Sequence, residues 1–256
     1  MLLNVKNLTV KVARTGQILV NQVNFDLNAK EVVAIVGGSG SGKTTTAMSI
    51  VRLLDPSLEI TGGSISFNGN NLAAFNNQQM RHIRGRDIAV VFQEPLYAFN
   101  PVFTIGYQIN EVLVYHTDLS RRQRQTRIPE LLDIVGISDP QRVKNHYPHQ
   151  LSGGMRQRAM IAQAIAADPR LIIADEPTSS LDVTLQARII ELFQKLKEEL
   201  SLSILLITHD LGVVGHLSDR VAVMTGGGIV EFGPAAQVMK TPKAEYTLEL
   251  MEALKF

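Results

Sequence analysis

The sequence contains no cysteine among its 256 residues. This absence excludes disulfide bonds, thiolate metal sites and cysteine-ligated iron–sulfur clusters, and it fits a protein of a reducing compartment. Long apolar runs are absent too, since none approaches the roughly 20 residues that a membrane-spanning helix needs. Residues 1–12 alternate polar and apolar side chains and lack the apolar core of a signal peptide. We therefore expect any role at a membrane to depend on a partner.

A strong charge of either sign is also missing. The formal net charge is +1, which argues against a dedicated nucleic-acid surface. Hydrophobic residues make up 45% of the chain and charged residues 19%. This balance predicts a folded globular protein rather than a disordered one, and the length allows one sizeable core with a subdomain.

Apolar runs and helical patterns alternate along the chain. We expect strands at 2–12, 18–28, 32–36, 64–67, 87–92, 171–174, 203–208 and 220–224, and helices at 42–54, 104–116, 120–135, 152–167 and 183–200. Helical patterns dominate between 95 and 167. The order predicts an α/β core, made of 1–94 and 168–256, with a helical insert at 95–167.

A glycine-rich loop, Gly37–Thr44, follows the buried strand 32–36 and matches G-x-x-x-x-G-K-T. Glycines let backbone N–H groups turn inward toward phosphate oxygens. Lys43 can reach the β and γ phosphates, and the Thr44 hydroxyl can ligate Mg²⁺. A chance glycine loop is disfavoured because this one lies between a strand and a helix. The predicted phosphate-binding residues are Gly37, Gly38, Ser39, Gly40, Ser41, Gly42, Lys43, Thr44 and Thr45.

Two carboxylates, Asp175 and Glu176, follow a second buried strand, and we expect both to be exposed at its carboxyl end beside the phosphate loop. Asp175 suits a Mg²⁺ ligand acting through water, and Glu176 suits a base that polarises the attacking water. The alternative is a helix cap with a first-turn acid. Gln93 and His209 also follow apolar strands, which predicts that they share the edge of Asp175, although caps or loop contacts would explain them as well.

Ser152, Gly153 and Gly154 open a helix. Ser152 suits an N-cap, but two glycines at the helix start cost up to about 1 kcal/mol each relative to alanine. That cost is understandable if a γ-phosphate must approach the backbone at the positive end of the helix.

In this order the motifs resemble the ATP-binding subunits of ABC transporters over essentially the whole chain. Gly37–Thr44 looks like the Walker A motif, Gln93 the Q-loop glutamine, Leu151–Met155 the signature, Leu171–Glu176 the Walker B segment, Ser180–Asp182 the D-loop and His209 the switch histidine. His146–Gln150 before the signature is similar to the oligopeptide, dipeptide and nickel importer branch. Ala98–Pro101 looks more like its nickel and metallophore members.

The resemblance implies an ABC-type P-loop ATPase core with an antiparallel β subdomain and an inserted helical subdomain. It implies ATP and Mg²⁺ as cofactors, and it implies roles for the residues outside the loop. The implied catalytic residues are Glu176, His209 and Gln93, the implied Mg²⁺ contacts are Thr44, Gln93 and Asp175, and the implied ATP contacts include Ser152, Gly153, Gly154 and Asp182.

The implied partners are a second ABC ATPase subunit (identical or homologous), two transmembrane permease subunits and an extracellular substrate-binding protein, with no nucleic acid. The chain would lie peripherally on the cytoplasmic face of the membrane and energise uptake of peptides or of nickel and metal chelates. The segment Pro95–His116 would offer a groove to the permeases, unless its apolar residues only pack the core. The alternative function is a soluble ABC ATPase of DNA repair or translation. It is disfavoured because long coiled coils, zinc-ligating cysteines and a second ATP domain are absent from the sequence.

Two positions depart from the family pattern. Lys30 stands where the family usually has glycine, so we expect that turn to be built differently. Ala13–Gln17 should supply an aromatic ring to stack on adenine but contains none, which leaves Arg14 as a stacking candidate.

Overall fold

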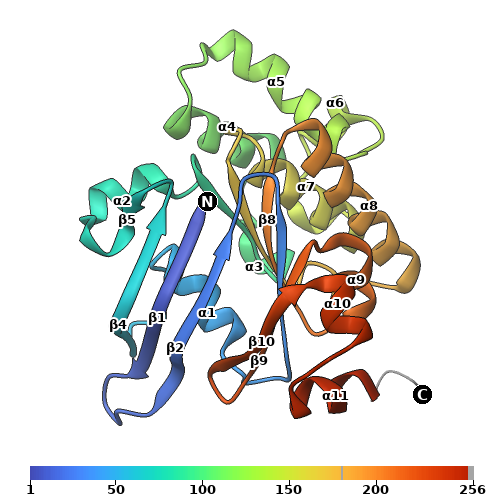
Figure 1. The fold of residues 1–256 in the computed structure, drawn as a ribbon. Helices are drawn as coiled ribbons and strands as arrows, with labels where there is room; N and C mark the ends of the chain where they lie inside the picture. Colours follow the sequence, from blue (N-terminus) through green and yellow to red (C-terminus); the bar gives the residue numbers. More distant parts are fainter. Residues whose placement is uncertain (180, 253–256) are drawn as a thin grey trace. The chain divides into compact units, whose positions relative to one another are not determined.

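A computed structural model describes residues 1–179 and 181–252 (Figure 1). Ser180, part of the predicted D-loop, lies outside the described residues. The chain divides into two compact units, one made of Met1–Met80 with Ser201–Phe256 and the other of Arg81–Leu200. The predicted helical segment 95–167 lies within the second unit. No described helix is long and apolar enough to cross a bilayer.

The first unit contains an antiparallel sheet in the order β2-β1-β4-β5. Its strands are β1 (Leu3–Val12), β2 (Ile18–Leu27), β4 (Leu58–Phe67) and β5 (Asn70–Asn71). Alternation along β1 and β2 places Val5, Val10, Val23 and Phe25 in the core, with polar neighbours on the other face. This is the antiparallel β subdomain that the family resemblance implies.

The same unit contains parallel strands whose central residues are all buried. In β3 (Val32–Val36) all five residues are buried, and β3 pairs in parallel with β8 (Ser203–Thr208) and β9 (Arg220–Thr225). The strand β10 (Gly228–Pro234) pairs with β9 in antiparallel fashion. Continuous burial is typical of parallel strands covered on both faces. The helical elements of this unit are α1 (Lys43–Ile50), η1 (Leu72–Ala74), α9 (Leu211–Leu217), α10 (Ala235–Lys240) and α11 (Glu245–Glu252), with α2 (Asn77–Ile83) spanning the division between the units.

The second unit pairs β6 (Ile88–Val91) with β7 (Leu171–Asp175) in parallel, and helices fill the sequence between them. These are α3 (Pro95–Ala98), α4 (Ile105–His116), α5 (Arg121–Ile134), α6 (Pro140–Val143), η2 (Pro148–Gln150) and α7 (Gly153–Ala164). The long helix α8 (Val183–Glu199) follows β7. Buried apolar residues of α4, α5 and α7, including Ile109, Leu131 and Ile161, form the core of this unit.

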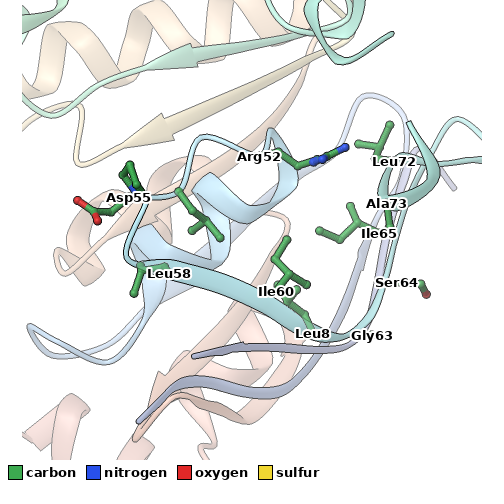
Figure 2. A pocket seen from close by; sticks show the side chains of 12 residues that line it. Leu8, Arg52, Asp55, Leu58, Ile60, Gly63, Ser64, Ile65, Leu72 and Ala73 are labelled. Atoms are coloured by element: carbon green, nitrogen blue, oxygen red, sulfur yellow. The ribbon is translucent and has the colours of Figure 1, made fainter. Parts of the chain in front are cut away.

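A cavity of about 430 Å³ lies in the first unit between β1, β4, η1 and the loop after α1 (Figure 2). Its lining is mainly aliphatic, with Leu8, Ile60, Ile65 and Leu72 among the contributing side chains. None of the loop residues Gly37–Thr44 lines it. Although Arg52 also lines it, this mainly aliphatic cavity lacks the glycine-rich loop and does not suit a nucleoside triphosphate.

Candidate functional site

The loop Gly37–Thr44 leaves the carboxyl end of β3 and enters α1, as the sequence predicts. Gly37 adopts a φ of 156°, and a Cβ built there would lie 2.0 Å from the carbonyl oxygen of Met224. Only glycine fits so close to another strand. Gly40 has a φ of 76°, and nothing lies within 4 Å of a Cβ built on it. The loop is therefore tight against β9 at its start and open at its middle, where a ligand can approach the backbone.

Lys43 points into this loop. Its Nζ donates to the carbonyl oxygens of Gly37 at 2.8 Å and Gly38 at 2.9 Å, and the residue is 7% exposed. The ammonium thus lies within the loop that the motif predicts for phosphate binding. A phosphate entering the loop would meet a positive charge that is already ordered.

The start of α1 has the properties of an anion site. Gly42 is its N-cap and has no side chain to cap the first N–H groups, whereas Thr104, Ser120 and Ser152 cap α4, α5 and α7 with their hydroxyls. Uncapped N–H groups and the helix dipole both favour a bound anion. The Ser41 Oγ is buried without a hydrogen-bond partner. An open loop, an uncapped helix and an orphaned hydroxyl together fit a nucleotide phosphate, and the exposed Thr44 fits a metal bound beside it.

His209 lies at the same edge of its unit as the phosphate loop. Val36 pairs with Thr208 in the parallel ladder of β3 and β8, so Gly37 and His209 both follow directly from paired residues. His209 is exposed, and Asp210 after it caps α9 by accepting from the backbone N–H groups of Gly212 and Val213. The cap of α9 thus belongs to Asp210 and not to His209.

In the second unit Gln93 and Glu176 share an edge in the same way. Val91 pairs with Ala174, so Gln93 and Glu176 each lie two positions after a residue of the last pair in this parallel ladder. Gln93 is exposed and Glu176 half-buried. The expectation that Asp175 is exposed is wrong, because the side chain is 5% exposed. The strand β7 runs one residue further than predicted and includes Asp175, and the buried Pro177 and Thr178 follow.

Glu176 occupies an unusual backbone conformation with a φ of 45°. Non-glycine residues in this left-handed region cost of order 1–3 kcal/mol and persist only where the surroundings hold them. Here the holding contacts are specific. Gln157 of α7, which is 1% exposed, donates from Nε2 to the Pro177 carbonyl at 2.7 Å, and Gln186 of α8 donates to the Thr178 carbonyl at 3.1 Å. The turn that carries the candidate base is therefore fixed by two helices.

The predicted cap of the signature helix is confirmed, since the Ser152 Oγ accepts from the Met155 N–H at 3.3 Å. The two glycines differ in their surroundings. A Cβ on Gly154 would lie 3.2 Å from the Leu185 side chain, whereas a Cβ on Gly153 would meet nothing within 4 Å. Packing against α8 explains Gly154, but no contact in the described unit explains Gly153. The hypothesis that a γ-phosphate approaches the backbone at this helix start therefore rests on Gly153.

Asp182 caps α8 by accepting from the Leu185 N–H at 2.9 Å, which is a structural role beside the predicted nucleotide contact. Two residues near the candidate site were not predicted from the sequence. One is Gln157, whose position in the signature helix gave no sign of its bond to the turn after β7. The other is Tyr246, whose hydroxyl accepts from the Gly38 N–H at 3.0 Å across 208 positions of sequence.

The phosphate loop in the first unit, and the signature helix and strand ends in the second, are each features of a phosphate-loop ATPase of the ATP-binding cassette type. Residues 20–179 match the sequence profile of the family described as ABC transporter. The chain is 49% identical to the "Putative peptide import ATP-binding protein" of Brucella ovis over 99% of its own length and 77% of that protein's length. A relative of the same description in Brucella melitensis is 49% identical over the same shares of both chains.

Two solved structures share the fold. A dimeric ATP-binding cassette in a post-hydrolysis state bound to ADP and Pi aligns with a TM-score of 0.80 and 29% identity, over 91% of this chain and 98% of that one. The protein cbiO1 from Clostridium perfringens, part of the ABC transporter complex cbiONQ, aligns with a TM-score of 0.82 and 26% identity, over 94% and 91%. The chain belongs to the ABC transporter family, and its fold is that of an ABC-type P-loop ATPase.

Proposed function

We propose that this protein is the ATP-hydrolysing subunit of an importer and that its cargo is peptide. The observation that carries the proposal is the phosphate loop, open at Gly40 and lined by the ordered Lys43 ammonium at the uncapped start of α1. The identity of 49% to proteins described as peptide import ATP-binding proteins supports the cargo class.

Each residue has a proposed role in hydrolysis. The backbone of the loop and Lys43 bind the β and γ phosphates, and Thr44, Gln93 and Asp175 suit Mg²⁺, whose chemical contribution is to offset charge on the phosphates. Glu176 accepts the proton of the attacking water. His209, the switch histidine that the family resemblance implies, is proposed to act with Glu176 in catalysis.

The signature segment is proposed to act in a dimer. Ser152, Gly153 and Gly154 present a helix start with open space at Gly153, and a relative of known structure is a dimer with ADP and Pi. We propose that these residues, with Asp182, complete the nucleotide site of a second ABC ATPase subunit. The isolated chain would then hydrolyse ATP weakly.

An exposed apolar surface in the second unit is proposed to contact the permeases. Phe92, Leu96, Val102, Phe103 and Tyr107 are between 37% and 68% exposed, although they are large hydrophobic residues. Clustered exposed apolar residues mark interaction sites. A hollow of about 170 Å³ lined in part by Phe92, Ala98 and Val112 lies in the same unit. Phe99 and Ile109 are buried, so core packing explains only part of the segment Pro95–His116.

The membrane location follows from this contact. With no described helix able to span a bilayer, the chain is proposed to lie at the cytoplasmic face through two permease subunits, supplied with cargo by an extracellular substrate-binding protein. Ala98–Pro101 resembles nickel and metallophore members, so a metal chelate is the second candidate cargo. Repair and translation are not favoured, because the relatives are described as import proteins.

The proposed function is tested by co-expressing the chain with candidate permease subunits from the same genome and reconstituting the complex in vesicles. We expect ATP hydrolysis to rise when the cognate binding protein is loaded with peptide, and radiolabelled peptide to accumulate only with ATP. Stimulation by nickel or a metal chelate alone would reassign the cargo. Failure of the chain to bind any membrane subunit would refute the importer assignment.

A further inference from the structure

The phosphate loop is held from outside by the last described helix of the chain. The Gly38 N–H donates to the Tyr246 hydroxyl of α11 at 3.0 Å, and a Cβ built on Gly38 would lie 3.3 Å from the same oxygen. Tyr246 therefore contacts the loop that the proposed function assigns to the phosphates, and it contacts the backbone group rather than a side chain.

The bond fixes one peptide unit from both sides. In a trans peptide the N–H and the preceding carbonyl point in opposite directions. The Tyr246 hydroxyl accepts a hydrogen bond from the N–H of the Gly37–Gly38 peptide, and the carbonyl of the same peptide accepts one from Lys43 at 2.8 Å. Glycine loses more freedom on ordering than any other residue. A hydroxyl that holds this peptide therefore removes disorder from the part of the loop that orients Lys43.

Tyr246 is itself held by a rigid support. The Glu231 carboxylate of β10 accepts from the backbone N–H groups of Lys243 and Ala244, each at 3.1 Å, directly before α11 begins. The turn between β9 and β10 also contacts the loop, since the Gly227 N–H donates to the Ser41 carbonyl at 3.2 Å. One hairpin thus supports the loop directly and, through Glu231, places the helix that carries Tyr246.

We propose that Tyr246 is a positioning residue for nucleotide binding, which orders the phosphate loop from α11, and that Glu231 acts on the loop through Tyr246. The proposal rests on the proposed nucleotide site at Gly37–Thr44. It concerns the affinity for ATP rather than the chemical step, because Tyr246 bonds the loop backbone and not a reacting group.

The first experiment measures Mg²⁺-ATP binding to the full chain by titration calorimetry for the wild type and Tyr246→Phe. Loss of one hydrogen bond to a backbone group should raise the Kd about 2- to 12-fold. Tyr115→Phe is the matched control, because it removes the hydroxyl of a 77% exposed tyrosine on α4 and should leave the Kd unchanged. In the assembled complex, Tyr246→Phe should raise KM for ATP and leave kcat near the wild-type value.

The second experiment tests the route through Glu231. Glu231→Gln should raise the Kd for ATP, and the double variant with Tyr246→Phe should bind no more weakly than Tyr246→Phe alone, since residues acting through one contact are not additive. Fully additive effects would overturn the role of Glu231.

An unchanged or lowered Kd in Tyr246→Phe, while the wild type binds ATP, would overturn the role of Tyr246 and leave the proposed function intact. A variant that loses stability without a change in KM would overturn it as well, because the residue would then only support the fold. A wild-type chain that binds no ATP would refute the proposed function itself.

Discussion

Replacing Gly153 with alanine separates stability from activity. Gly153 is the first residue of α7, its φ is not positive, and an added Cβ would meet nothing within 4 Å. Alanine is favoured over glycine in helices by up to about 1 kcal/mol, so the isolated chain should be as stable as the wild type or slightly more stable. By the usual scaling for a chain of this size, the Tm should rise by about 0–4 °C.

The same substitution should impair the assembled complex. If a partner's γ-phosphate approaches the backbone at Gly153, a methyl group there stands in its path. We expect ATP hydrolysis by the complex to fall at least tenfold, which corresponds to about 1.4 kcal/mol. Thermal unfolding of the chain and steady-state hydrolysis by the reconstituted complex are the two assays.

Gly154→Ala is the contrasting variant. Its Cβ would lie 3.2 Å from the Leu185 side chain, so crowding against α8 should make this substitution less favourable for the stability of the isolated chain than Gly153→Ala. Wild-type hydrolysis by a complex containing Gly153→Ala would refute the reasoning, because the open space at Gly153 would then have no ligand to explain it.

Three further predictions follow from the same geometry. Glu176→Gln should bind ATP but hydrolyse it roughly 10²–10⁴-fold more slowly, because an amide cannot accept the proton; an unchanged single-turnover rate would contradict this. Lys43→Ala should weaken ATP binding roughly 10- to 150-fold through loss of a charge-assisted hydrogen bond worth about 1.5–3 kcal/mol, as titration of the chain would show. The Arg220 guanidinium lowers the pKa of Asp26 by hydrogen bonds of 2.9 and 3.1 Å. The stability from this pair is present above the ordinary Asp pKa of 3.8 and is lost as the pH falls below it. Asp26→Asn should therefore remove about 1 kcal/mol of the decrease in the free energy of unfolding at acid pH. An unchanged pH dependence of that free energy would refute the link.

The parallel strands could be predicted closely because their signal is local. The apolar runs at 32–36 and 203–208 match β3 and β8 residue for residue. The predicted helix 42–54 is shorter in the structure, where α1 ends at Ile50 and Arg52 takes a φ of 53°. The predicted strand 64–67 is longer, since β4 begins at Leu58. Its first residues are largely exposed and are held by pairing with β1, which no local pattern reveals.

The turn at Lys30 shows how a residue can replace glycine. Lys30 adopts a φ of 63°, the left-handed conformation in which glycine is usual, and its N–H donates to the Ser203 Oγ at 2.8 Å. The turn therefore keeps a glycine-like backbone, and the distant serine compensates part of its cost. The expectation that this turn is built differently from that of the family stays a prediction. Because Ala13–Gln17 contains no aromatic ring to stack on adenine, we predict only modest selectivity for ATP over GTP.

The candidate site was predictable where a motif carries the chemistry and not where a distant residue holds the motif in place. Glu176 could be named from its position after a buried strand, but its strained backbone and the bond from Gln157 to the Pro177 carbonyl depend on the folded second unit. Gln157 lies on α7, the helix that begins at Ser152. A direct hydrogen bond therefore joins that helix to the turn that carries Glu176. If a partner's phosphate docks at Ser152–Gly154, this buried amide provides a short physical connection from dimer closure to the orientation of the base. The signature segment and the candidate base Glu176 are then linked through Gln157, although the sequence presents them as separate motifs.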